Sequence, residues 1–185
     1  MSNGGKVWPK VWIGLFRGIN IGGNRMPMKE LGRLLEAEAL SDVKTYIASG
    51  NVLFRSDLDE ADLTAMIEGL VERHFGFRSR LFLIDLPHLN TVIAKNPFAF
   101  HPHQGKAQHI FFLKDFVSFD ETRARDLKAD SEDFTLTEEA FYLYAPDGIG
   151  RSKLAEKLHQ CLKADMTARN LNTVETLRHM AVDMT

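Results

Sequence analysis

The feature that most constrains the fold of this 185-residue chain is an order of apolar segments that occurs twice. Short apolar runs predict strands, and apolar residues three and four positions apart predict helices. In the first half we expect strands at 11–16, 43–48, 52–56 and 77–84, with helices at 26–40 and from 58 onward. The order is repeated by strands at 108–113, 134–137, 141–145 and 165–168 and helices at 120–128 and 152–163.

The spacing between corresponding segments is similar in the two halves. The first strands begin at 11 and 108, which are 97 residues apart, and the third strands at 52 and 141, which are 89 apart. This order predicts an α+β fold of two duplicated ferredoxin-like βαββαβ units with antiparallel sheets. We expect a first unit at 6–86, a linking helix and loop at 87–106, and a second unit with a C-terminal helix at 107–185.

Polar residues ahead of the helical stripes predict where helices begin. Asp57 is the expected cap of the second helix, with Glu60 as its capping-box partner. The expected caps of three later helices are Asp85, Ser152 and Asn172.

Composition and charge are those of an ordinary soluble globular protein, with 44% hydrophobic and 26% charged residues. A net charge of −2 does not supply the basic field that nucleic-acid binding commonly uses. No apolar run approaches the roughly 18 residues of a membrane span. Residues 1–5 are interpreted as a flexible leader without a secretory signal. The single cysteine, Cys161, is expected to be a core thiol, and these features together favour the cytoplasm without membrane association.

The connection "FRGINIGGNRMPM", residues 16–28, combines glycines with two arginines. Gly18, Gly22 and Gly23 allow positive φ angles, and the loop leads into the start of a helix. Arg17 and Arg25 add forked donors. The pattern is neither a Walker A loop nor a dinucleotide fingerprint, and a plain strand-to-helix connection is the alternative. We interpret the loop as one wall of an anion site.

Three other stretches have a related character. In "GIGRSKL", Arg151 and Lys153 flank the expected cap Ser152, where cations oppose the helix dipole unless an anion is bound. In "TARNLNT", the residues Arg169 and Asn170 have no expected capping role. The predicted hairpin turn "ASGNV" contains Ser49 and Asn51, and a turn that requires Gly50 is the alternative explanation.

Other candidates are weaker. Three histidines, at 101, 103 and 109, resemble a metal cluster but lack supporting carboxylates or cysteines, so no metal or cofactor is expected. Trp8 and Trp12 are interpreted as packing residues.

Five motifs together resemble a known bacterial family. They are "LFRGINIGG" (15–23), "SGNVLF" (49–54), "NPF" (96–98), "GRSKL" (150–154) and "ARNLNT" (168–173). The chain resembles the domain-of-unknown-function family 1697 (DUF1697). The resemblance implies a duplicated ferredoxin-like α+β fold and no established activity. Two departures are Leu171, where the family usually has tryptophan, and Asn24–Arg25, where it often has lysine.

We expect the polar motifs to form a shared site between the two units for an anionic small molecule, such as a nucleotide or phosphorylated metabolite, with turnover left open. The expected ligand-binding residues are Arg17, Asn20, Gly22, Gly23, Arg25, Ser49, Asn51, Arg151, Ser152, Lys153, Arg169 and Asn170. The alternatives are a nucleic-acid-binding module that uses the sheets and an interaction scaffold without a ligand. The sequence assigns no catalytic residue and no oligomeric state.

Overall fold

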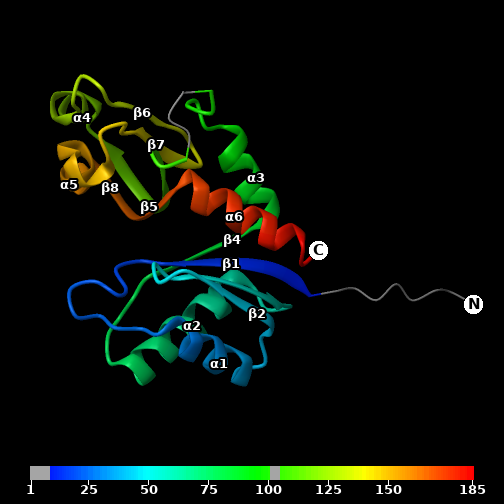
Figure 1. Cartoon of the computed structure of the whole chain (residues 1–185). Coiled ribbons are helices and arrows are strands. Elements are labelled where there is room, and N and C mark those ends of the chain that lie inside the picture. Colours follow the sequence, from blue (N-terminus) through cyan, green and yellow to red (C-terminus); the bar gives the residue numbers. More distant parts are fainter. Residues whose placement is uncertain (1–8, 101–104) are drawn as a thin grey trace, which may run out of the picture. The chain divides into compact units, whose positions relative to one another are not determined.

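A computed structural model describes residues 9–100 and 105–185 (Figure 1). The expectations for the leader, Trp8, His101 and His103 lie outside these residues. The described chain forms two compact units of mixed α+β structure, with two four-stranded antiparallel sheets and six α-helices. Unit 1 extends to Leu86 and includes His179–Thr185, and unit 2 is Pro87–Arg178.

Unit 1 contains a sheet in the strand order β2-β3-β1-β4, in which every neighbouring pair is antiparallel. The helices α1 and α2 cover one face of this sheet (Figure 1). The elements are β1 (Lys10–Phe16), α1 (Met28–Ala37), β2 (Ser41–Tyr46), β3 (Asn51–Ser56), α2 (Glu60–Phe75) and β4 (Leu81–Asp85).

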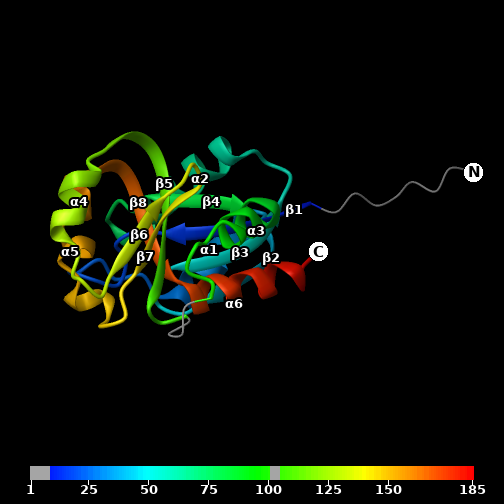
Figure 2. The same ribbon diagram turned by 90° about the horizontal axis from the view of Figure 1, so that it is seen from above.

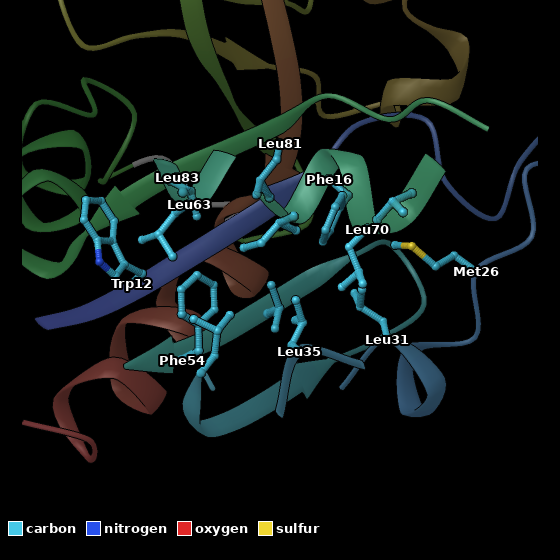
Figure 3. Packing of buried hydrophobic residues seen from close by; sticks show 14 of the residues in the cluster. Trp12, Phe16, Met26, Leu31, Leu35, Phe54, Leu63, Leu70, Leu81 and Leu83 are labelled. Atoms are coloured by element: carbon cyan, nitrogen blue, oxygen red, sulfur yellow. The ribbon is translucent and has the colours of Figure 1, made fainter. Parts of the chain in front are cut away.

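The core of unit 1 follows from alternation along the strands, because successive side chains point to opposite faces of a sheet. Trp12 and Phe16 of β1, with Phe54 of β3, pack against the helices, and Figure 3 shows these side chains gathered around Leu35 and Leu63. The expectation that Trp12 is a packing residue is therefore confirmed.

Unit 2 contains a sheet with the corresponding strand order, β6-β7-β5-β8, again antiparallel throughout. The helices α4 and α5 lie side by side in Figure 2, over a cluster that includes buried Cys161, as expected. The elements are α3 (Leu86–Ala94), β5 (Gln108–Phe119), α4 (Glu121–Leu127), β6 (Asp133–Leu136), β7 (Ala140–Tyr144), a 3-10 turn (Ile149–Arg151), α5 (Lys153–Cys161), β8 (Leu162–Asn170) and α6 (Leu171–Val182).

The segment that was expected to link the units is hydrogen-bonded to the unit 2 sheet. The Tyr142 hydroxyl donates to the Val92 carbonyl oxygen at 2.7 Å. Beyond α3, Asn96 Nδ2 donates to Gln108 Oε1 at 2.7 Å, and Gln108 Nε2 donates to the Phe98 carbonyl oxygen at 2.7 Å. These buried bonds make residues 87–100 a part of unit 2.

Several expected element ends are wrong. Asp59, not Asp57, caps α2 by accepting from the Asp62 amide at 2.9 Å. Asp85 ends β4 instead of capping α3. β4 starts at Leu81, four residues later than expected, while β5 and β8 are longer than expected. Within the described residues, none of the helices has both the length and the apolar composition needed to cross a bilayer.

Candidate functional site

Hydrogen bonds among Gly18, Asn20 and Asn24 close the base of the glycine-rich loop after β1, and we call this closed base the neck. Asn24 Nδ2 donates to the Gly18 carbonyl oxygen at 3.2 Å, and the Asn20 amide donates to the Asn24 carbonyl oxygen at 2.6 Å. Arg17 comes directly before Gly18 and Arg25 directly after Asn24, so the two arginines flank the neck in the sequence. Both side chains are exposed.

The glycines of the loop have the positive φ angles that the sequence predicts. Gly22 has a φ of 57° and Gly23 a φ of 94°. A Cβ atom added at either position would meet nothing within 4 Å, so the backbone conformation, and not crowding, requires glycine here. Their part in ligand binding stays a prediction.

A third arginine, Arg80, lies directly beside Arg17. The Arg17 amide donates to the Arg80 carbonyl oxygen at 2.9 Å, which continues the register of Phe16 opposite Leu81 by one residue. Side chains at opposed positions of antiparallel strands share a face, with Cβ atoms about 5 Å apart. Buried Ser79 fixes this arrangement by donating its hydroxyl to the Arg17 carbonyl oxygen at 2.8 Å.

Sequence reasoning missed Arg80. It stands directly before the apolar run of β4, and this position is the signal that could have identified it. Its pairing with Arg17 depends on the register between β1 and β4, which are far apart in the sequence.

The β2–β3 turn borders the same end of the sheet. The Phe16 amide donates to the Gly50 carbonyl oxygen at 2.8 Å, and Asn51 lies opposite Leu15. Gly50 has a φ of 84°, and a Cβ atom there would lie 2.5 Å from Ile19 Cδ1, so only glycine fits. Arg17, Ser49 and Asn51 therefore lie at one end of the sheet, and a ligand site shared by them stays a prediction.

The side chain of Asn51 donates hydrogen bonds within the β2–β3 turn. Its residue exposure is 0%, and Nδ2 donates to the Tyr46 carbonyl oxygen at 2.9 Å and to Ser49 Oγ at 3.1 Å. The amide of Asn51 is thus enclosed and engaged within the turn, and the ligand contact that the sequence suggested for it stays a prediction. Ser49 is exposed, and its ligand contact stays a prediction.

The side chain of Asn20 also forms hydrogen bonds with backbone groups of two neighbouring segments. Its Nδ2 donates to the carbonyl oxygens of Met26 at 3.0 Å and Ala48 at 2.7 Å, and its Oδ1 accepts from the Met26 amide at 2.8 Å. Both amide protons connect the loop to backbone oxygens, one of them in the β2–β3 turn, and the expected ligand-orienting role stays a prediction.

Two cavities of unit 1 adjoin these elements. One, of about 470 Å³, lies beside α2 and is lined by Ala65, Glu68, Gly69, Glu72, Arg78, Ser79 and Arg80. Its carboxylates are already engaged, because Glu68 accepts from the Leu81 amide at 2.8 Å and Glu72 pairs with Arg78 at 2.8 Å. The other, of about 360 Å³, is lined by Asn20, Arg25, Met26, Pro27, Met28, Ile47 and Ala48.

In unit 2, the start of α5 has the predicted structure. Ser152 caps the helix, with Oγ accepting from the Ala155 amide at 3.0 Å, and the residue is 4% exposed. This cap uses the hydroxyl that the sequence assigned to a ligand. Arg151 and Lys153 are exposed, and within 9–100 and 105–185 no side-chain partner is found for either. They remain candidates for contact with an anion.

The motif "TARNLNT" joins β8 to α6. Arg169 is 7% exposed, and Nη1 donates to Thr167 Oγ1 at 3.0 Å and to the Ala168 carbonyl oxygen at 2.8 Å. Burial lowers the pKa of Arg169 to about 10. Asn170 Oδ1 accepts from the Thr173 amide at 2.9 Å, so Asn170, and not Asn172, caps α6. The expectation that Asn170 has no capping role is wrong.

His109 lies opposite Asn170 in the register of β5 and β8. It is 8% exposed, and burial lowers its pKa. Within the described part of the chain its Nδ1 has no hydrogen-bond partner. Among the described residues, no group of three or more histidine, cysteine or carboxylate side chains is placed to hold a metal ion.

The arginine neck and both cavities of unit 1 lie within residues 10–142, which match the sequence profile described as "Protein of unknown function (DUF1697)". The chain belongs to the DUF1697 family. The match includes β1 to β6 and ends within β7, before Arg151 and α6.

A solved structure has the same fold as this DUF1697 protein. It is a conserved bacterial protein from Streptococcus pneumoniae, with a TM-score of 0.74 and 22% sequence identity. The likeness covers 94% of this chain and 98% of that chain. At this identity it establishes the fold alone. A comparison with curated proteins finds no match.

Proposed function

We propose that this protein binds an anionic small molecule, such as a nucleotide or a phosphorylated metabolite, at the loop neck of unit 1. The observation that carries the proposal is the pairing of Arg17 and Arg80 at directly opposed backbone positions, beside the neck that Arg25 follows in the sequence. Two guanidinium groups that share one face can both donate charge-assisted hydrogen bonds to a single anion.

The expected affinity is modest. Each charge-assisted hydrogen bond contributes roughly 1.5–3 kcal/mol, so three contribute roughly 4–9 kcal/mol before the cost of association. The anionic group alone should therefore bind with a dissociation constant of about millimolar to micromolar. Specificity has to come from contacts with the rest of the ligand.

We also infer that the two units are ferredoxin-like copies from an internal duplication. This inference is supported by the shared element order βαββαβ and by the corresponding strand orders. In unit 2 the exposed pair Arg151 and Lys153 is a second candidate for anion contact. The expected site shared between the units stays a prediction.

Inorganic phosphate tests the proposal most directly, by calorimetric titration against sodium chloride at equal ionic strength. The variant Arg17→Ala/Arg80→Ala should bind phosphate at least tenfold more weakly than the parent protein. The variant Arg33→Ala/Arg73→Ala removes the same charge from exposed positions on α1 and α2, and its affinity should be unchanged. Equal weakening in both variants would show a general charge effect and contradict a site at the neck.

Nucleic-acid binding remains the alternative function, and salt separates it from the proposal. Binding to a phosphate backbone through several contacts weakens steeply and linearly on a logarithmic salt scale. Tight, salt-dependent binding of single-stranded RNA without saturable binding of phosphate would favour the alternative.

A further inference from the structure

One side chain, Asn20, joins the walls of the 360 Å³ cavity beside the neck. Its walls come from the glycine-rich loop, the start of α1 and the β2–β3 turn. Asn20 joins these walls through its bonds to Met26 and Ala48. The cavity is therefore part of the folded unit and does not require a ligand to form.

Ile47, on the turn side of this cavity, is placed unfavourably for stability. Its φ is 50°, a left-handed conformation that β-branched residues rarely adopt. Its side chain is also 50% exposed. Asparagine or glycine would relieve both costs, so the isoleucine gives the folded protein alone no evident benefit.

The other residues that line the cavity favour the hydrocarbon part of a ligand over a nucleobase, whose edges carry polar groups. Met26, Pro27, Met28 and Ala48 add apolar or small surface, and methionine adapts readily to the shape of a ligand. Both amide protons of Asn20 are already donated to backbone oxygens, so this side chain has none left for the edge of a nucleobase.

One positive charge lines the same cavity. Arg25 is exposed, and within residues 9–100 and 105–185 its guanidinium has no ionic or hydrogen-bonding partner. A cation next to an apolar cavity is complementary to an anion that carries a hydrocarbon group.

We propose that this cavity binds the hydrocarbon part of an anionic ligand, with its phosphate or carboxylate held by Arg25 at the neck. The inference rests on the proposed anion binding and narrows it, because it favours an alkyl or aryl phosphate over a nucleotide.

The test compares phenyl phosphate, inorganic phosphate and adenosine monophosphate by calorimetric titration of the full chain. Phenyl phosphate should bind at least tenfold more tightly than inorganic phosphate or adenosine monophosphate. The variant Ile47→Asn should lose this tenfold preference and leave phosphate binding unchanged. Asparagine is tolerated at positive φ, so the melting temperature of this variant should not fall.

Ile21→Asn is the matched control. Ile21 is 66% exposed on the glycine-rich loop but does not line the cavity, so its variant should keep the full preference for phenyl phosphate.

A parent protein that binds phenyl phosphate no more tightly than inorganic phosphate overturns the inference. An unchanged preference in Ile47→Asn, or equally tight binding of adenosine monophosphate, also overturns it. Binding of inorganic phosphate alone decides the proposed function separately, so the two ideas can fail independently.

Discussion

At the scale of single residues, His109 places a titratable ring inside unit 2. The ring lies on β5, where successive residues are buried, and its Nδ1 has no hydrogen-bond partner among residues 9–100 and 105–185. Burial disfavours the charged form, which lowers the pKa of His109 below its ordinary value of about 6.5. The neutral ring is therefore the form compatible with this core.

The pH dependence of stability follows from this lowered pKa. Below about pH 6.5 the unfolded chain binds a proton at this residue more readily than the folded chain does. The contribution of neutral His109 is thus fully present above that pH and is lost as the pH falls through the folded-state pKa. Urea unfolding of the parent protein and His109→Leu between pH 7.5 and 5 measures it. The parent should lose more stability than the variant, and parallel profiles would contradict the prediction.

Asn20 and Asn51 show why residue roles were harder to predict than residue positions. Both are in the predicted polar motifs, and both lie beside the β2–β3 turn. Their amides are nevertheless used by the backbone of neighbouring loops. Whether an asparagine meets a carbonyl oxygen or a ligand depends on how two loops meet, and that geometry is not encoded in local spacing.

At the scale of elements, α5 begins with two cations that its dipole does not favour. Arg151 ends the preceding 3-10 turn and Lys153 is the first residue of the helix. Each such charge costs a few tenths to about 1 kcal/mol unless a negative group is nearby.

Replacing Arg151 and Lys153 together by alanine should leave the apo protein as stable as before or slightly more stable. The same change should abolish the specific rise in melting temperature with phosphate, which is expected to exceed the general effect of a kosmotropic salt. Scanning calorimetry with chloride at equal ionic strength provides the control. A variant that is less stable and responds to phosphate like the parent would remove this turn from the candidate site.

Element identity was predictable, while element ends were not. Ser152 caps the helix that the sequence assigned to it, because no other serine, threonine, asparagine or aspartate lies within four residues of it. Asp57 and Asp59 compete two residues apart, and so do Asn170 and Asn172, so local sequence cannot select between them. β5 extends past its expected end through an irregularity near Asp115, whose φ is 53°. The exposed residues that follow do not show the alternation of a strand.

At the scale of the whole molecule, the repeated order of elements could be predicted from the sequence. Each unit has its own core, so the strands and helices of both units carry apolar faces that show as local patterns. The sequence does not show that the last seven residues join the first unit. Four of those residues, His179–Val182, are the last turn of α6, whose local pattern continues without a break from unit 2. Only long-range contacts reveal that the chain returns to unit 1, and these leave no local periodicity.

This return predicts that the C-terminus stabilises unit 1. Met184 is 4% exposed and lies in the segment that belongs to unit 1. Truncating a buried methionine to alanine typically costs about 2–5 kcal/mol, and a value near the lower end is expected close to a chain terminus. Met184→Ala should therefore speed hydrogen exchange of β1 and β3 amides more than of β5 and β7 amides, as read by mass spectrometry of peptides.

Met166→Ala is the matched variant, because Met166 packs against the unit 2 core and should produce the opposite pattern. Equal loss of protection in both sheets of Met184→Ala would mean that the two units unfold as one, and the C-terminal segment would then have no special relation to unit 1.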